Sequence, residues 1–205
     1  MNGFLKESKQ YIFLFFGIIT CSFSPLKNNK SSVQIENLRC EYLVNPLGID
    51  VIDPRFSWEL TSSERAKSQK AYEILVASDS LLLSQGIGDI WKSGKVSAIE
   101  SNQVSYKGKP LISDKSYFWK VRIWDETGNV SEWSSISFWS MGLLLASDWK
   151  AKWIGLPSIL PAVEQDRHIV PPSPLLRKEF TLTKKVRRAT LFSTSLGIYN
   201  IYLNG

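Results

Sequence analysis

The residues best suited to acid–base chemistry lie close together near residue 165. Glu164, Asp166 and His168 fall within five residues, and His168 is the only histidine of the 205-residue chain. An imidazole beside two carboxylates is suited to proton transfer or to a weak metal site. The surrounding residues 156–174 carry five prolines and predict a loop. A loop holds such groups poorly in the geometry that catalysis requires, so we predict no catalytic residue here.

Patterns for other catalytic or metal-dependent chemistry are missing from the sequence. Asp125 and Glu126 are adjacent and belong to DETGN, a run that favours a tight turn. No Gly-x-Ser-x-Gly elbow accompanies His168. Cys21, Cys40 and His168 lie at remote spacings that match no zinc pattern. We predict no catalytic residue, no metal and no cofactor in this chain.

The charge of the chain gives little reason to expect nucleic acid as a partner. The formal net charge is +6, but the basic residues are spread along the sequence. The densest basic run, TKKVRRA at 183–189, falls between two strand-like segments and predicts a solvated turn. No helix-turn-helix, zinc or RNA-recognition signature accompanies it, so we predict no nucleic-acid binding.

Residues 1–20 have the layout of a signal peptide. A polar start with two lysines precedes the apolar run YIFLFFGII at 11–19. Nine helical residues span only about 14 Å, against a hydrocarbon core of about 30 Å. Ile18-Ile19-Thr20-Cys21 resembles the lipobox of bacterial lipoproteins, which predicts lipidation of Cys21. The alternative is plain cleavage nearby and a free soluble product.

The predicted leader has consequences for location and for the second cysteine. Residues 21–32 are polar and predict a tether. We expect an exported protein of the bacterial cell envelope, lipid-anchored in the outer membrane or periplasmic. Cys40 then has no disulfide partner and is expected to be a small buried hydrophobe. A Cys21–Cys40 disulfide is the alternative in an exported protein.

Tryptophans supply the candidate contact residues. In YFWKVRIWDETGNVSEWS at 117–134, Tyr117, Trp119, Val121 and Ile123 share one face of an alternating pattern and predict a buried strand face before a turn. Three further tryptophans fall outside that face and are candidates for contact with carbohydrate or with another domain: Trp91, Trp124 and Trp133. Of these two alternatives we favour packing between domains, because aromatic residues dominate interface cores.

Short alternating segments separated by turn residues fill residues 33–142. They predict an all-β sandwich of about 100 residues, with Trp58 and Trp119 in its core. We expect LRCEYLV at 38–44 to form the first strand and SDSLLLSQGIG at 78–88 to hold one helical turn. FSWEL, YFWKV and GNVS resemble a fibronectin type III fold.

Residues 143–205 predict a second, partial β-sandwich. PLLRKEFTL, ATLFSTS and IYNIYLNG are strand-like, and the final Asn204-Gly205 is a strong hairpin signal. A returning strand would have to lie beyond residue 205, so we expect this sandwich to be incomplete.

Seven stretches follow one another along residues 38–205 in this order: LRCEYLVNPLGIDVIDPRFSWEL, YEILVASDS, IWKSGKVSAIESNQVSYKGKPL, YFWKVRIWDETGNVSEWSSISFWSMGLL, DWKAKWIG, PLLRKEFTL and ATLFSTSLGIYNIYLNG. Their order resembles the N-terminal region of bacterial α-L-rhamnosidases. Lys92, in a predicted surface turn, departs from that family, which often has aspartate there.

The resemblance implies an accessory role without chemistry of its own. In that family a fibronectin-like module and a β-sandwich precede an (α/α)₆ barrel, which carries the catalytic carboxylates. The barrel removes terminal α-L-rhamnose by inversion, with carboxyl groups about 6.5–9.5 Å apart. The resemblance ends before the barrel, so we expect a chain inactive alone that meets rhamnose-containing carbohydrate through domains it lacks. The alternative is a stand-alone carbohydrate-binding or structural protein.

Overall fold

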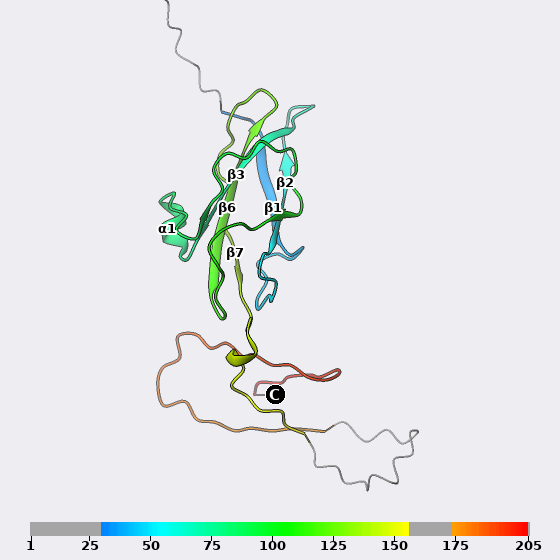
Figure 1. The fold of residues 1–205 in the computed structure, drawn as a ribbon, viewed down its shortest axis with the longest axis vertical. Coiled ribbons are helices and arrows are strands. Elements are labelled where there is room, and N and C mark those ends of the chain that lie inside the picture. The colour runs from blue at the N-terminus through cyan, green and yellow to red at the C-terminus, as the bar shows by residue number, and fades with distance from the viewer. Residues whose placement is uncertain (1–29, 156–173, 205) are drawn as a thin grey trace, which may run out of the picture.

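The described residues form a β-sandwich of seven strands. The computed structural model describes residues 30–155 and 174–204. A three-stranded sheet has the order β1-β2-β5, and a four-stranded sheet has the order β4-β3-β6-β7 (Figure 1). The predicted all-β fold is confirmed. The strands are β1 Gln34–Cys40, β2 Arg55–Thr61, β3 Gln69–Ala77, β4 Trp91–Lys92, β5 Val104–Ser105, β6 Ser116–Asp125 and β7 Ser137–Ser140.

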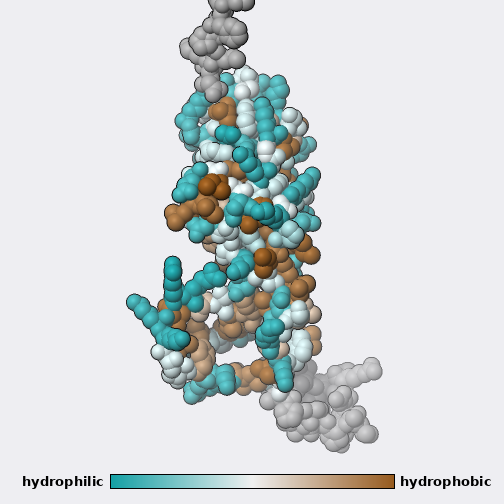
Figure 2. Space-filling model, turned by 60° about the vertical axis from the view of Figure 1, so that its left-hand side comes forward, coloured by the Kyte–Doolittle hydropathy of each residue, from teal (hydrophilic) through white to brown (hydrophobic). Residues whose placement is uncertain are grey.

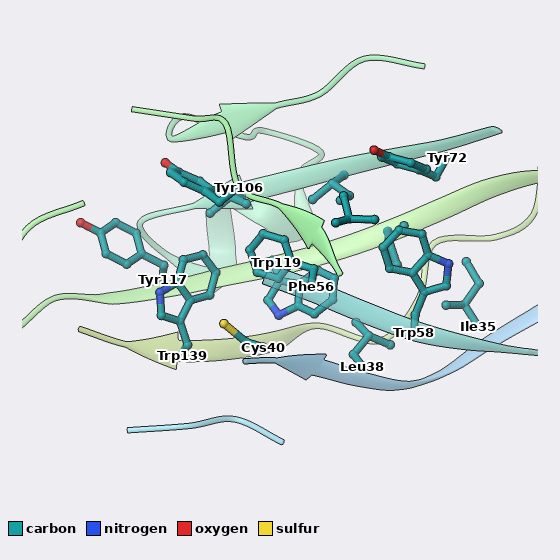
Figure 3. Packing of buried hydrophobic residues seen from close by; sticks show 14 of the residues in the cluster. Ile35, Leu38, Cys40, Phe56, Trp58, Tyr72, Tyr106, Tyr117, Trp119 and Trp139 are labelled. Carbon is teal, nitrogen blue, oxygen red and sulfur yellow. The ribbon is translucent and has the colours of Figure 1, made fainter. Parts of the chain in front are cut away.

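Aromatic rings fill the space between the two sheets. Phe56 of β2 contacts Trp119 of β6, with 4.4 Å between ring centroids, and Trp139 of β7 at 5.3 Å. Figure 3 shows Phe56 and Trp119 at the centre of the core, between Trp58 and Trp139. Truncating a side chain of this kind costs about 3–5 kcal/mol of stability. The predicted core positions of Trp58 and Trp119 are confirmed by exposures of 3% and 0%.

The first strand lies earlier in the chain than its sequence suggests. It covers Gln34–Cys40 instead of 38–44. Glu41 and Tyr42 have φ angles of 47° and 66°, which end the extended backbone directly after Cys40. The apolar residues that follow, which include Leu43 and Val44, are exposed in the loop before β2.

The predicted turn after β6 is confirmed, and serine hydroxyls replace part of the backbone ladder beyond it. The turn begins at Asp125, and β7 then pairs with only the first residues of β6, from Ser116 to Trp119. Beyond that point Val121 N–H donates to Ser134 Oγ at 3.1 Å, and Ile123 N–H donates to Ser131 Oγ at 3.0 Å. The edge of β6 therefore keeps its backbone donors satisfied without a full partner strand.

A short helix covers the outer side of the four-stranded sheet. The helix α1, Ser80–Ser84, begins after Asp79, whose carboxylate accepts from Leu81 N–H at 2.7 Å. Its Leu83 is fully buried against Leu75 and Ala77 of β3. Figure 1 shows α1 on the side of this sheet that faces away from β1 and β2.

Residues after β7 show little regular structure. The 3-10 helix η1, Ala146–Asp148, follows β7, and the described residues 174–204 form no strand. A strand requires a hydrogen-bonding neighbour, and these segments have none within the described part of the chain. The partial second sandwich over 143–205 stays a prediction.

The predicted leader lies outside the described residues. The residues 1–20, most of the tether and Cys21 fall there. Among the helices that the structure does describe, none combines the length and hydrophobicity needed to cross a bilayer.

Candidate functional site

The three candidate tryptophans occupy two separate places on the sandwich. Trp124 of β6 and Trp133, in the segment after the turn, lie on the outer face of the four-stranded sheet. Trp91 of β4 packs instead against the core between the sheets. All three are half-buried. The candidate contact residues therefore form two separate sites, one on the outer face and one at Trp91.

On the outer face, cationic side chains alternate with the two tryptophan rings. Arg122 Cζ lies 5.2 Å from the ring centroid of Trp124 and 4.6 Å from that of Trp133. Lys95 Nζ lies 4.6 Å from the centroid of Trp124, and Lys120 Nζ lies 4.9 Å from that of Trp133. We call these five residues the cation–aromatic row. Each such contact contributes about 0.5–1 kcal/mol at exposed sites and more where water is excluded.

The cation–aromatic row is fixed to β3 by an ion pair. Arg122 Nη2 lies 2.6 Å from Glu73 Oε2, and Arg122 Nε donates to the same oxygen at 2.8 Å. The two residues are direct cross-strand partners in β6 and β3. Because Arg122 contacts both rings and the carboxylate at once, its position is determined from three sides.

Lys120 shows how far the row is shielded from water. Its residue exposure is only 6%, and burial, with the neighbouring Arg122 charge as a second cause, lowers the pKa of its ammonium group. Trp133 also packs against the small apolar cluster that contains Leu83. Both tryptophan rings of the row thus already have cationic partners, an arrangement suited to a stable packed face.

Trp91 combines core packing with exposure at the sheet edge. Its ring stacks on Phe56 at 6.3 Å and meets Tyr106 edge-on at 5.3 Å. It also lines a pocket of about 450 Å³. Lys92, expected in a surface turn, lies beside Trp91 in β4 and pairs with Leu75 of β3.

Figure 2 shows one outer face of the molecule, where hydrophobic side chains form separate groups among hydrophilic ones. The most exposed large apolar side chains of the sandwich lie outside its strands, as at Leu47 with 77% and Ile99 with 75%. The described residues therefore expose apolar side chains mainly outside the strands.

The acidic candidates in the turn serve the fold. Asp125 is fully buried, and its Oδ1 accepts from the backbone N–H groups of Thr127 and Asn129. Glu126 accepts from Ser68 N–H at 3.0 Å and from Lys67 Nζ at 3.2 Å. These contacts confirm that DETGN is a turn. Glu164, Asp166 and His168 lie outside the described residues.

No metal cluster emerges from the part of the chain that the structure describes. Groups of three or more histidine, cysteine or acidic side chains placed to hold an ion do not occur among residues 30–155 and 174–204. Cys40 is a buried free thiol, and burial, followed by the charge of Glu41, raises its pKa to about 12. Its expected role as a small buried hydrophobe fits this environment.

Sequence reasoning missed the partners that organise the outer face. Glu73 and Arg122 belong to no motif, and each lies opposite the apolar face of an alternating segment. Their opposite charges in neighbouring predicted strands were a signal, but using it requires the register of β3 against β6, which the sequence does not provide.

Comparison with known families settles the nature of the sandwich. The family model described as "Rha78A-like, N-terminal immunoglobulin domain" matches residues 35–145. The chain belongs to this family. The predicted resemblance to the N-terminal region of α-L-rhamnosidases is thereby confirmed, and the sandwich fold expected as fibronectin type III-like corresponds to this immunoglobulin domain.

Similar curated proteins are α-L-rhamnosidases that are much longer than this chain. One from Formosa agariphila is 40% identical over 195 residues, covering 94% of this chain and 20% of that protein. Another from Streptomyces avermitilis is 44% identical over 130 residues, covering 63% of this chain and 12% of that protein. The chain therefore spans about a fifth or less of the length of these relatives.

Solved structures agree with the sequence matches. The crystal structure of Streptomyces avermitilis α-L-rhamnosidase complexed with L-rhamnose matches with a TM-score of 0.58 and 44% identity, over 61% of this chain and 12% of that chain. The structure of α-L-rhamnosidase from Dictyoglumus thermophilum matches with a TM-score of 0.59 and 40% identity, over 61% and 14%.

Proposed function

We propose that this chain is the non-catalytic N-terminal part of an α-L-rhamnosidase that removes terminal α-L-rhamnose from glycosides. The observation that carries this proposal is the alignment of 94% of the chain with only 20% of an α-L-rhamnosidase. The described residues agree with an accessory role, because Asp125 and Glu126 hold a turn and Glu73 is engaged in an ion pair.

The sandwich is suited to holding two parts of a protein apart. The chain enters beside the turn after β6, where Lys30 bridges to Val130, and leaves past Met141, which bridges to Ile49. Figure 1 places these two points at opposite ends of the sandwich. The ten residues of β6 run between the ends and span about 33 Å. The domain would separate a membrane anchor from the domains that follow.

The accessory role is tested with an aryl rhamnoside and with the genomic DNA. We expect the purified 205-residue chain to release no nitrophenol from nitrophenyl α-L-rhamnoside. We expect the DNA downstream of codon 205 to encode a helix-rich continuation, in the same or a shifted frame, and the protein that includes it to cleave the substrate. Turnover by the chain alone, or DNA without such a continuation, would refute the proposal.

We further propose that the mature protein is exported and anchored through acyl chains on Cys21. The support is the apolar run before Cys21 and its likeness to a lipobox. Each buried methylene contributes about 0.8 kcal/mol to membrane binding. Mass spectrometry of the N-terminal peptide should find an acylated cysteine, and Cys21→Ser should move the protein from the membrane to the soluble fraction. An unmodified Cys21 in membrane-extracted protein would exclude this anchor.

A further inference from the structure

The edge of the sandwich between β4 and β5 holds a pocket of about 450 Å³. This volume lies within the range of about 300–1,000 Å³ that is typical of small-molecule sites. The pocket takes residues from both sheets and from the loop that joins β4 to β5. Its lining includes Tyr72, Trp91, Val96, Glu100, Asn102 and Gln103. We call it the edge pocket.

The loop that forms one side of the edge pocket is held by a buried amide. Gln69 is 4% exposed, and its Nε2 donates to the carbonyls of Ala98 at 3.2 Å and of Glu100 at 2.8 Å. Its Oε1 accepts from Trp58 Nε1 at 2.9 Å. Trp58 N–H also donates to Ser101 C=O at 2.9 Å. A rim fixed in this way loses little conformational freedom when a ligand binds.

The edge pocket has an apolar wall and a polar rim. Tyr72 and Val104 are buried and Trp91 is half-buried, whereas Asn102 and Gln103 are exposed. An aromatic and aliphatic wall receives the apolar face of a small ring, and side-chain amides supply donors and acceptors for hydroxyl groups.

Two rim amides retain unused hydrogen-bonding groups. Asn102 Oδ1 accepts from Ser57 Oγ at 2.8 Å, and Gln103 Nε2 donates to the hydroxyl of Tyr42. Asn102 Nδ2 and Gln103 Oε1 have no partner among the described residues. The rim therefore presents one amide donor and one amide acceptor from adjacent residues, a pattern that fits neighbouring hydroxyl groups.

The charges around the edge pocket favour a neutral ligand. Glu100 and Lys107 both line it and have opposite charge. Burial, together with the nearby Glu100 carboxylate, raises the pKa of Tyr72, so its hydroxyl stays protonated and can donate a hydrogen bond. Because the charges of Glu100 and Lys107 offset each other, the lining gives neither an anionic nor a cationic ligand a net advantage.

We propose that the edge pocket binds one neutral 6-deoxyhexose unit of a carbohydrate, with L-rhamnose as the probe. The apolar wall at Trp91, Val96 and Val104 accommodates the ring face and the methyl group, and the rim amides contact the hydroxyl groups. The choice of L-rhamnose rests on the proposed function. The position of the site rests on the pocket itself.

Titration followed by nitrogen–proton NMR of the 205-residue chain tests this inference. L-rhamnose should cause saturable shifts at the Trp91 indole N–H and at the side-chain amides of Asn102 and Gln103, with a Kd on the order of millimolar. L-mannose, which differs from L-rhamnose only by a hydroxyl in place of one hydrogen of the methyl group, should bind more weakly. Shifts that are absent up to about 100 mM, or that are scattered over the surface, would overturn the proposal.

Two variants that each remove one side-chain amide test whether the sugar binds in the edge pocket. Asn102→Ala should weaken binding by up to about tenfold, because one hydrogen bond contributes about 0.5–1.5 kcal/mol. Gln85→Ala, which removes an exposed amide beside α1, should leave the affinity unchanged. Equal affinity in Asn102→Ala and the unaltered chain would place the sugar elsewhere and refute the edge pocket.

Failure of sugar binding at the edge pocket can be distinguished from failure of the proposed enzymatic function. A longer gene product that cleaves an aryl rhamnoside, while the chain shows no saturable shift with L-rhamnose, would refute the edge pocket alone. Saturable binding at Asn102 and Gln103 by a chain whose gene product cleaves no rhamnoside would refute the enzymatic proposal alone.

Discussion

Arg122 and Glu73 pair across the outer face of the four-stranded sheet, with 2.6 Å between Nη2 and Oε2. The side chain of Glu73 is 7% exposed and that of Arg122 is 33% exposed. The rings of Trp124 and Trp133 lie within 5.2 Å and 4.6 Å of the guanidinium carbon. The cation–aromatic row therefore depends on one arginine that meets a carboxylate and two indole rings.

Removing Arg122 should destabilise the domain strongly. Arg122→Leu leaves the Glu73 carboxylate buried without its partner, and we expect a loss of about 2–3 kcal/mol in the free energy of unfolding, below the range for fully buried pairs because Arg122 is partly exposed. Urea unfolding followed by tryptophan fluorescence measures this loss. The double variant Glu73→Leu/Arg122→Leu is the control and should recover part of it. A double variant as unstable as the sum of the singles would contradict the pairing.

The serine hydroxyls along β6 should contribute measurably to stability. Ser131→Ala removes the acceptor for Ile123 N–H in a buried position, so we expect a loss of about 1–2 kcal/mol. Ser135 is exposed, and Ser135→Ala should change stability by less than about 0.5 kcal/mol. Thermal and urea unfolding of both variants give the comparison. Equal effects would mean that the Ser131 hydroxyl does not complete the sheet edge.

Acid should weaken the sandwich through Asp125. Burial opposes ionisation of this carboxylate, but hydrogen bonds from Thr127 and from the backbone hold its pKa below the ordinary 3.8. A pKa lowered by folding gives stability that is present above 3.8 and is lost as the pH falls through the folded-state pKa. The urea concentration at the midpoint of unfolding should therefore decrease as the pH falls below about 4.

Asp125→Asn tests the origin of this acid sensitivity. The variant should be less stable at pH 7, and its stability should depend less on pH below about 4. Glu41 is a second carboxylate with a lowered pKa, caused first by its hydrogen bond from Arg55. The ordinary pKa of Glu41 is 4.5, so the stability that it contributes begins to be lost at a slightly higher pH than that of Asp125. An Asp125→Asn variant with the parental pH profile would assign the acid sensitivity to other groups.

Cys40 should resist modification while the domain is folded. A rise of the thiol pKa from 9.0 to about 12 lowers the thiolate fraction about a thousandfold, and the side chain is 1% exposed. In a Cys21→Ser variant, a maleimide at pH 8 should label Cys40 only after denaturant unfolds the sandwich. Rapid labelling in native buffer would show that the β1 end opens frequently.

The alternation of apolar and polar residues, together with the length of about 100 residues, was enough to predict the core of the sandwich. Tyr117, Trp119, Val121 and Ile123 repeat every second residue, and all four are buried as a two-sheet sandwich requires. The end of β1 was misplaced because the apolar residues after Cys40 extend the pattern, whereas left-handed φ angles at Glu41 and Tyr42 end the strand. Such local conformations depend on the packing of distant segments.

The edge pocket and the cation–aromatic row depend on register and loop geometry. Trp91, Trp124 and Trp133 were recognised as outward candidates, but their division into two places needed the pairing of β3 with both β4 and β6. Asn102 and Gln103 gave no periodic signal, because they lie in a loop whose shape is set by Gln69.

The hydroxyl-capped edge of β6 also bears on how the protein behaves among its own copies. A bare strand edge invites pairing with another polypeptide and can seed fibrils. At Val121 and Ile123 the amide hydrogens are already taken by Ser134 and Ser131. This stretch therefore offers no template to a neighbouring chain, and molecules at high concentration can lie side by side without polymerising through it.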